Sequence, residues 1–339
     1  MEIAHTPPTM ADVAALAGVS HQTVSRVLNN HPSVSEKTRQ KVNDSIATLG
    51  YRRNLAARAL ATGDTRIIGV LVSNTSLSGP SGALLAIEQA ARSRGYWVAV
   101  AGLQSRDPSE AADAISHFID FGADGIIAIA QTQAAADATL KASQGVPTLL
   151  VTSGVVPPGI STLDIDQAGG ATQAMTILRG LGHTRIAHVS GPEGDLHAGV
   201  RESVWREMVP DTDPAHSLCI EGDWSAGSGY RATMQIMASG ACPTAIFAAN
   251  DRMAFGVLRA LNERGLTVPH DMSVVGFDDF EGSDCAIPPL TTIRQDHEAL
   301  SQAAMELLLE AIANQPARAI RIPATLVVRS SAGAVPRPR

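Results

Sequence analysis

The chain has 339 residues, of which 45% are hydrophobic and 17% charged, and its formal net charge is −7. This composition suffices for two or three domains with buried cores, and it excludes a disordered or collagen-like chain. The sequence contains no apolar run of about 18 residues, so it predicts no membrane span. Its three cysteines are scattered, which excludes a disulfide framework or a zinc knuckle.

Residues 9–50 predict three short helices. Thr9, Ser20 and Ser35 stand at N-cap positions, and Gly18 ends the first helix where a left-handed residue is preferred. Apolar residues recur at helical spacing in each segment. They are Val13, Leu16 and Ala17, then Val24, Val27 and Leu28, then Val42, Ile46 and Leu49.

The second predicted helix, residues 21–28, follows the first after a short glycine-containing turn, which is the form of a helix-turn-helix. A chance pair of short helices has the same outline, but the tight spacing and the polar outer face of the second helix favour DNA binding, and the charge distribution is consistent with it. Residues 1–66 carry a net charge of +3 and the remainder −10, and phosphate attraction is screened within about 10 Å, so one basic end is sufficient. The outer face of this helix is polar, with Ser20, His21, Gln22, Ser25, Arg26 and Asn29.

Residues 51–64 form a polar, alanine-rich connector in which Leu60 is the chief large apolar residue. The pattern allows either a plain linker or a helix that orders on a partner.

From residue 66 onward, predicted strands alternate with amphipathic helices. The strands are 67–72, 97–101, 125–130, 148–151, 185–189, 245–249 and 273–277, and the helices include 83–94, 110–121, 170–181, 228–238 and 252–264. Alternation of this kind predicts an α/β fold with parallel sheets covered on both faces. So many units favour two doubly wound lobes, with a ligand held between them at the carboxyl ends of the strands.

Several stretches in order carry a family resemblance. ADVAALAGVSHQTVSRVLNN, LGHTRIAHVSGP, PTAIFAANDRMAFGVLRAL and SVVGFDD resemble the LacI family of bacterial regulators, and the likeness runs from residue 9 to about 330. It implies a headpiece at 1–50, a hinge helix at 51–65 and a ligand-binding core at 66–339 like the type I periplasmic sugar-binding proteins. The implied N-lobe is about 66–164 and 295–324, and the C-lobe about 165–294 and 325–332.

The resemblance also implies how DNA is bound, by a homodimer on a palindromic operator. Helix 21–28 would lie in the major groove, with His21, Gln22 and Arg26 at base edges. Phosphates would be held by Ser20, Thr23, Ser25, Asn29, Ser35 and Thr38. Leu60 would wedge into a minor-groove base step with Ala57 beside it. His21 replaces a tyrosine and Arg53 a proline of family members.

A sugar pocket needs a flat apolar surface and fork-shaped polar groups, and the resemblance supplies candidates. Trp224 would stack on the sugar, while Arg201, Asn250 and Asp278 would bind hydroxyls; individually, each also suits a cap or a core position. Other expected members are Ser73 and Gln295, with Leu77, Pro80 and Ala83 as an apolar wall. The chain departs from family pockets at three places. His297 replaces a phenylalanine of the family, and Thr152 stands where the family has an aspartate. Near Asp164 and Ile165, no residue of this chain can be aligned with a further aromatic residue of the family pocket.

These features predict a repressor in the cytoplasm, released from its operator by a small sugar such as a galactoside, with no cofactor. Another sugar, a corepressor-dependent member and an activator stay open within the family. A transport component would need a signal peptide, whose pattern is absent, and an enzyme would need a catalytic set. The adjacent Asp278 and Asp279 point to opposite faces of a strand and so do not form an opposed pair of glycosidase carboxylates.

The dimer interface is expected at helix 81–94 and the loop 285–287, with Glu88 in place of a family lysine. The chain shows no leucine heptads after the core, so we expect a dimer and not a tetramer.

Overall fold

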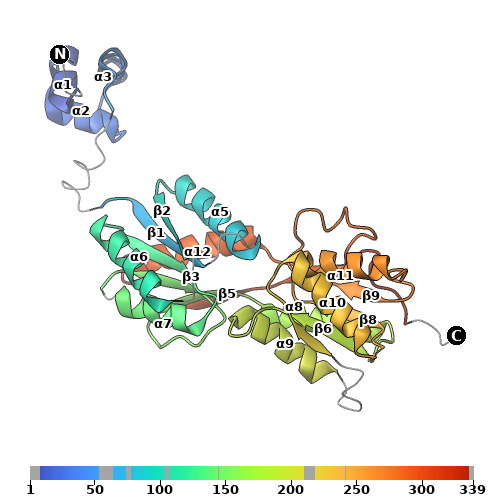
Figure 1. Cartoon of the computed structure of the whole chain (residues 1–339). Helices are drawn as coiled ribbons and strands as arrows, with labels where there is room; N and C mark the ends of the chain where they lie inside the picture. Colours follow the sequence, from blue (N-terminus) through green and yellow to red (C-terminus); the bar gives the residue numbers. More distant parts are fainter. Residues whose placement is uncertain are drawn as a thin grey trace, which may run out of the picture. The chain divides into compact units, whose positions relative to one another are not determined.

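The computed structural model describes residues 8–52, 64–73, 78–103, 107–143, 145–209, 218–240 and 242–335. The chain divides into two compact units, residues 1–65 and 66–339 (Figure 1). No helix in the described part is long and apolar enough to cross a membrane.

The first unit contains three helices, α1 (Met10–Ala17), α2 (His21–Leu28) and α3 (Glu36–Leu49). Each has a hydroxyl N-cap, and Gly18 and Gly50 close α1 and α3 with φ of +64° and +63°. The helices pack around Val13, Val24 and Val42, all fully buried. Leu16, which the helical spacing puts on the apolar face of the first helix with Val13 and Ala17, is 53% exposed and not part of this core. It lies on the flank of α1, beside the buried stripe of Val13 and Ala17.

In the second unit, a six-stranded sheet has the order β11-β5-β4-β3-β1-β2, and all its strands are parallel. We call this sheet and its helices the N-lobe. Its strands are β1 (Ile67–Ser73), β2 (Trp97–Leu103), β3 (Gly125–Ile129), β4 (Thr148–Val151), β5 (Ser161–Ile165) and β11 (Ala319–Ile322). The central strands are apolar on both sides because helices cover both faces.

One face of this sheet packs on α5 (Ser78–Ser93) and α12 (His297–Ile312), and the other on α6 (Pro108–Asp120) and α7 (Gln133–Ala142). Neighbouring strand residues alternate between the two cores. Ile127 packs toward the α5 and α12 side, while Ile126 and Ala128 pack toward Ile115 and Phe118 on the other.

The C-lobe is built on a four-stranded parallel sheet of order β7-β6-β8-β9. Its strands are β6 (Ile186–Ser190), β7 (Cys219–Glu221), β8 (Ala245–Ala248) and β9 (Ser273–Val275). Helices α8 (Gln167–Gly180) and α9 (Leu196–Met208) pack against one face, and α10 (Ala226–Ala238) and α11 (Asp251–Glu263) against the other. The two doubly wound lobes confirm the predicted α/β fold.

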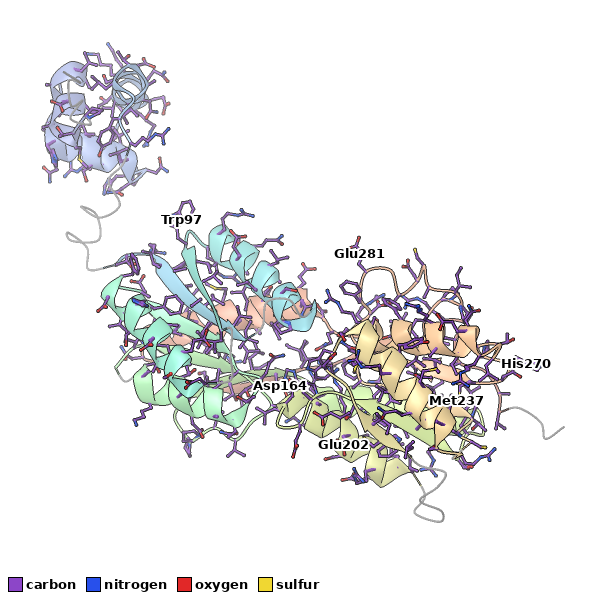
Figure 2. The ribbon with its side chains drawn as sticks, viewed as in Figure 1. Trp97, Asp164, Glu202, Met237, His270 and Glu281 are labelled. Atoms are coloured by element: carbon purple, nitrogen blue, oxygen red, sulfur yellow. The ribbon has the colours of Figure 1, made fainter. Side chains whose placement is uncertain are left out.

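The chain passes between the lobes three times, at 165–167, 294–297 and 322–325. A short antiparallel pair adjoins the last two crossings: β10 (Thr292–Arg294) leads into the second crossing, and β12 (Thr325–Val327) follows the third. Strand β11, near the end of the chain, then completes the N-lobe sheet beside β5. The carboxyl ends of both sheets face the region where the lobes meet, where Asp164 is labelled in Figure 2.

Candidate functional site

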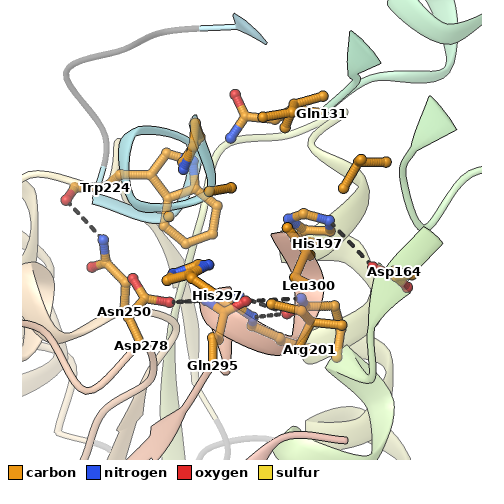
Figure 3. Close-up of a pocket in the computed structure, with 17 residues that line it drawn as sticks. Gln131, Asp164, His197, Arg201, Trp224, Asn250, Asp278, Gln295, His297 and Leu300 are labelled. Atoms are coloured by element: carbon orange, nitrogen blue, oxygen red, sulfur yellow. Dashed lines mark hydrogen bonds and ion pairs between the residues drawn. The ribbon is translucent and has the colours of Figure 1, made fainter. Parts of the chain in front are cut away.

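A cleft lies between the carboxyl ends of the two sheets, as expected for doubly wound folds. Its lining encloses about 640 Å³, a volume that includes the open mouth of the cleft. Figure 3 shows the residues that line it. They are Gly79, Pro80, Ala83, Ile129, Gln131, Val151, Asp164, Ile165, Gln167, His197, Arg201, Trp224, Asn250, Asp278, Gln295, His297 and Leu300.

Arg201, in the second turn of α9, is the buried cation of the cleft, with 3% of its surface exposed. Its guanidinium lies 3.6 Å from the centroid of the Phe277 ring. It donates to the backbone oxygen of Ala249 and, through Nε and Nη2, to Oε1 of Gln167 at 3.0 and 2.6 Å. Its Nη1 lies 3.7 Å from a carboxylate oxygen of Asp278. These contacts therefore fix the orientation of the Arg201 guanidinium within the protein itself.

Asp278 closes a ring of polar side chains with Arg201. Gln295 donates to Asp278 at 2.6 Å, Gln167 donates to Gln295 at 3.3 Å, and Gln167 in turn accepts from Arg201. Gln167 and Gln295 stand on two of the three crossings between the lobes. Burial raises the pKa of Asp278 to about 6, against the lowering effect of Arg201. The ring therefore joins the binding cleft directly to the segments about which the lobes would move.

Trp224 forms the flat apolar wall of the C-lobe side. It is 7% exposed, lines the cleft and has a left-handed φ of +68°. The indole lies against Gly191, where a Cβ would come within 2.3 Å of the ring. Asn250 donates to the backbone oxygen of Trp224 at 3.1 Å and caps α11 by accepting from the Met253 amide at 2.9 Å. Asn250 therefore both caps α11 and lines the cleft.

The N-lobe side of the cleft is largely apolar. Pro80 and Ala83 contribute to it from α5, as the apolar wall predicted from the sequence. His297, the first residue of α12, lies against Gly82, and burial lowers the pKa of its imidazole. Its Nδ1 is buried without a hydrogen-bond partner.

Asp164, His197 and Gln131 form a polar group on the lining of the cleft that is not evident from the sequence. Asp164 is the penultimate residue of β5 and accepts from Ser153 Oγ at 2.7 Å, and its other oxygen lies 3.8 Å from His197 Nε2. Burial is the main cause of the raised pKa of Asp164 and the lowered pKa of His197. One signal was in the sequence: His197 lies four residues before Arg201, on the same face of a helix.

The other predicted pocket residues have different outcomes. Leu77 and the side chain of Ser73 lie outside the described residues. Thr152, which stands where family members have an aspartate, is not among the residues that line the cleft, and its Oγ1 accepts from the Gly154 amide at 3.1 Å. Asp279 is held by Arg294 and Arg329, each at 2.7 Å, away from Asp278.

Asp251 lies beneath the cleft and gives a prediction for the pH dependence of stability. It is fully buried and accepts from the Phe280 amide at 2.8 Å, Ser283 Oγ at 2.6 Å and Thr292 Oγ1 at 2.5 Å. Burial, with the nearby Asp278 carboxylate, raises the pKa of Asp251 to about 7. The folded state therefore binds this proton more tightly than the unfolded chain, so the contribution of Asp251 to stability falls as pH rises from about 4 to 7.

Replacing Asp251 with asparagine should remove that dependence. Relative to D251N, the wild type should lose up to about 1.4 kcal/mol of unfolding free energy per pH unit over this range. Urea unfolding at pH 5, 6 and 7 measures the difference, with the exposed Asp44→Asn as control. If the unfolding free energies of wild type and D251N change in parallel with pH, Asp251 does not titrate with a raised pKa in the folded protein.

The candidate DNA-reading surface is the outer face of α2. His21, Gln22, Arg26 and Asn29 are exposed, and Thr23 and Ser25 half-exposed. At the start of α2, the Ser20 and Thr23 hydroxyls hydrogen-bond at 2.9 Å, and Ser35 and Thr38 do the same at the start of α3. Helix N-termini with such groups suit phosphate oxygens. The predicted hinge residues Ala57 and Leu60, and Arg53, lie outside the described residues.

Comparison with known proteins follows this division. Residues 9–54 match the family model for bacterial regulatory proteins of the lacI family, and residues 175–332 match that for a periplasmic binding protein-like domain. The chain is 37% identical to the lactose operon repressor of Escherichia coli (strain K12) over 327 residues, which are 96% of this chain and 91% of that protein. It is 33% identical over 325 residues to the transcriptional regulator CelR of Thermobifida fusca, covering 93% and 95% of the two chains.

Solved structures agree. The lac repressor dimer bound to operator and the anti-inducer ONPF has a TM-score of 0.87 at 36% identity, covering 97% of this chain and 100% of that one. The complex of CelR with cellobiose has a TM-score of 0.71 at 30% identity, covering 96% and 99%. These relatives are transcriptional regulators and not enzymes. The resemblance seen in the sequence is confirmed: this chain belongs to the LacI family of DNA-binding bacterial regulatory proteins.

Proposed function

We propose that this protein represses a sugar-utilisation operon and is released from its operator when a neutral glycoside, such as a galactoside, binds the cleft. The observation that carries the proposal is the pairing of one flat aromatic wall, Trp224, with the fixed polar groups of Arg201, Asn250 and Asp278. Structures of relatives bound to ONPG and to cellobiose support a glycoside ligand.

Recognition of a pyranose would divide between these groups. The Trp224 indole covers the C–H face of the ring, while Arg201 donates to, and Asp278 accepts from, neighbouring hydroxyls. A ligand hydroxyl would bind to side chains that hydrogen bonds already hold in place. Little side-chain entropy is then lost on binding, and the fixed positions of the polar groups give specificity. The carboxylates Asp164 and Asp278 disfavour an anionic ligand such as a phosphosugar.

Release of DNA would then be a population shift between two arrangements of the lobes. A sugar that contacts both lobes favours one arrangement. Because Gln167 and Gln295 belong to both the polar ring and the crossings, ligand contacts bear directly on the angle between the lobes. The arrangement favoured without sugar would be the one in which paired hinges bind operator.

A homodimer on a palindromic operator is part of the proposal. Leu85 on α5 is 65% exposed and Ile287 93% exposed, and apolar side chains of this size at the surface suit a subunit interface. They lie on the two segments that the sequence predicts for this interface. Glu88 pairs with Arg92 of the same helix at 3.4 Å, so in the described structure its charge is balanced within the subunit.

The test is one titration and one binding curve on the same full-length preparation. Isothermal titration with lactose, methyl galactoside and methyl glucoside should show binding of at least one sugar. That sugar should weaken binding to a palindromic operator in a gel-shift assay. If none of the sugars binds, the glycoside assignment is wrong. If added sugar strengthens operator binding, the sugar acts as a corepressor and not as an inducer.

The hinge gives a separate prediction. Leu60→Ser should weaken operator binding about tenfold or more, because a polar residue cannot replace the apolar wedge that opens a base step. Sugar affinity should be unchanged, as the cleft lies in the other unit. Fluorescence anisotropy with labelled operator, and titration with sugar, measure the two effects. Equal losses of both affinities would contradict a hinge role.

A further inference from the structure

The third crossing between the lobes is held by a side chain that does not line the cleft. Gln173, in the second turn of α8, donates from Nε2 to the backbone oxygen of Ala324 at 2.9 Å and accepts at Oε1 from the Leu326 amide at 3.0 Å. Its side chain is half-buried and is not among those that line the cleft. We call Gln173 and these two backbone groups the Gln173 clamp. It joins α8 of the C-lobe to the chain at the point where the chain returns from the N-lobe.

The Gln173 clamp takes the place of a neighbouring strand. Strand β12 pairs with β10 along one edge, with Leu326 opposite Ile293, and the clamp occupies the other edge. A residue of a parallel strand would donate to one carbonyl and accept from the amide two residues further on, and the side-chain amide of Gln173 does both. Its Nε2 also donates to the Gly169 oxygen at 3.3 Å, which fixes the amide on the helix. Ala324 and Leu326 are therefore attached to the C-lobe.

The clamp confines bending of the third crossing to a very short segment. Ile322 still belongs to the N-lobe sheet, where it lies opposite Ile165 at the end of β5, whereas Ala324 is buried and held on the C-lobe. Only the exposed Pro323 lies between them. The first crossing runs alongside, because the Asp166 amide donates to the Ile322 oxygen at 2.7 Å. The two crossings therefore share one pivot, at Asp166 and Pro323.

We propose that Gln173 is a positioning residue for the movement of the lobes, and that the strength with which sugar binding releases the operator depends on its clamp. The proposal rests on the sugar-released repression proposed above. A ligand shifts two arrangements only by its differential affinity for them. With the clamp in place, a sugar that contacts both lobes turns them about one pivot. Without it, the third crossing can bend over a longer stretch, so the cleft fits the sugar with a smaller change in the N-lobe.

Gln173→Met tests the clamp, because methionine fills a similar volume but makes neither hydrogen bond. The measured quantity is the release ratio, which is the operator Kd at saturating sugar divided by the operator Kd without sugar. Fluorescence anisotropy on the full-length protein gives both values, with whichever of lactose, methyl galactoside and methyl glucoside binds the wild type. Since allosteric coupling usually changes affinity about 5- to 150-fold, Q173M should lower the release ratio by about 3- to 10-fold. Sugar affinity without DNA should change less than about threefold, because no cleft contact is altered.

Gln173→Glu is a second variant, which serves if methionine impairs folding. Its carboxylate still accepts from the Leu326 amide but cannot donate to the Ala324 oxygen. The release ratio should fall in Q173E as well, because Ala324 is then no longer held.

Gln133→Met is the matched control. Gln133 makes the same two kinds of bond to the backbone, donating to the Val155 oxygen at 2.8 Å and accepting from the Val155 amide at 2.9 Å, but both partners lie within the N-lobe. Q133M and Q173M should lower the urea midpoint to a similar extent, and only Q173M should lower the release ratio.

The outcomes separate the two proposals. If sugar releases operator equally well from wild type and Q173M, or if Q133M lowers the release ratio as much as Q173M, the clamp only stabilises the fold. The positioning role is then overturned while the proposed function stands. If no sugar binds the wild type, the proposed function fails and the positioning role falls with it.

Discussion

Arg201→Lys is expected to weaken sugar binding about 100-fold or more and to leave operator binding intact, so that sugar no longer releases DNA. Lysine keeps the positive charge near Asp278 but has no planar fork. It cannot hold Gln167 through two nitrogens while presenting a third to ligand. Loss of two charge-assisted hydrogen bonds, each contributing about 1.5–3 kcal/mol, accounts for the magnitude.

Lysine is a better test than alanine at this position. Arg201→Ala would leave a buried carboxylate without its cation, which costs about 3–5 kcal/mol of folding stability and would confuse unfolding with loss of binding. Isothermal titration gives the affinity, and a gel shift with added sugar gives the release. Arg206→Lys, on the same helix but exposed and paired with Glu202, is the control. Sugar affinity within threefold of wild type in R201K would contradict the assigned role.

Gln22→Ala and Arg26→Ala are expected to reduce operator affinity by about 1–3 kcal/mol each, the range for one bidentate contact to a base. Both side chains are exposed on α2, so the substitutions should leave the folded headpiece intact. The effect should be confined to specific DNA for Gln22, because a neutral amide contributes little to phosphate attraction. Affinity for random duplex should therefore stay near its wild-type value in Q22A.

Binding curves at several salt concentrations separate base reading from charge. The slope of log affinity against log salt should be unchanged in Q22A, because no counterion is released by a neutral side chain. Gln40→Ala is the control, since Gln40 is exposed on α3 and hydrogen-bonds Asp44 within the same helix. Equal weakening of operator and random DNA in Q22A would show that Gln22 does not read a base.

Much of the fold could be predicted because local patterns agreed with the final packing. In the strand at 148–151, three apolar residues follow Thr148 and all four residues are buried, so the apolar run predicted a strand that is covered on both faces. The headpiece helices begin at hydroxyl caps that the sequence shows directly. By contrast, β5 alternates between buried and half-buried residues, and β10 and β12 have three residues each. Such short segments become strands through their neighbours, not through propensity.

The site was predicted where one residue type has a distinctive chemistry. Trp224, Arg201 and Asp278 follow from the family resemblance and from what a sugar requires. The Asp164–His197 pair could not be found, because residues 33 positions apart meet only when β5 and α9 are brought together by the junction of the lobes. Gln167 was missed for a related reason: its role comes from lying on a crossing, which no local pattern reveals.

The threefold passage between the lobes has a consequence for synthesis on the ribosome. Strand β5 acquires its outer neighbour only from residues 319–322, and α12, which covers the N-lobe sheet, begins at His297. The half that is translated first is therefore finished last, after the C-lobe sheet has fully emerged. A ribosome that stops before residue 297 would release a nascent chain whose N-lobe sheet lacks α12, one of the two helices that cover this face, and the exposed apolar surface makes that chain a ready substrate for chaperones and proteases.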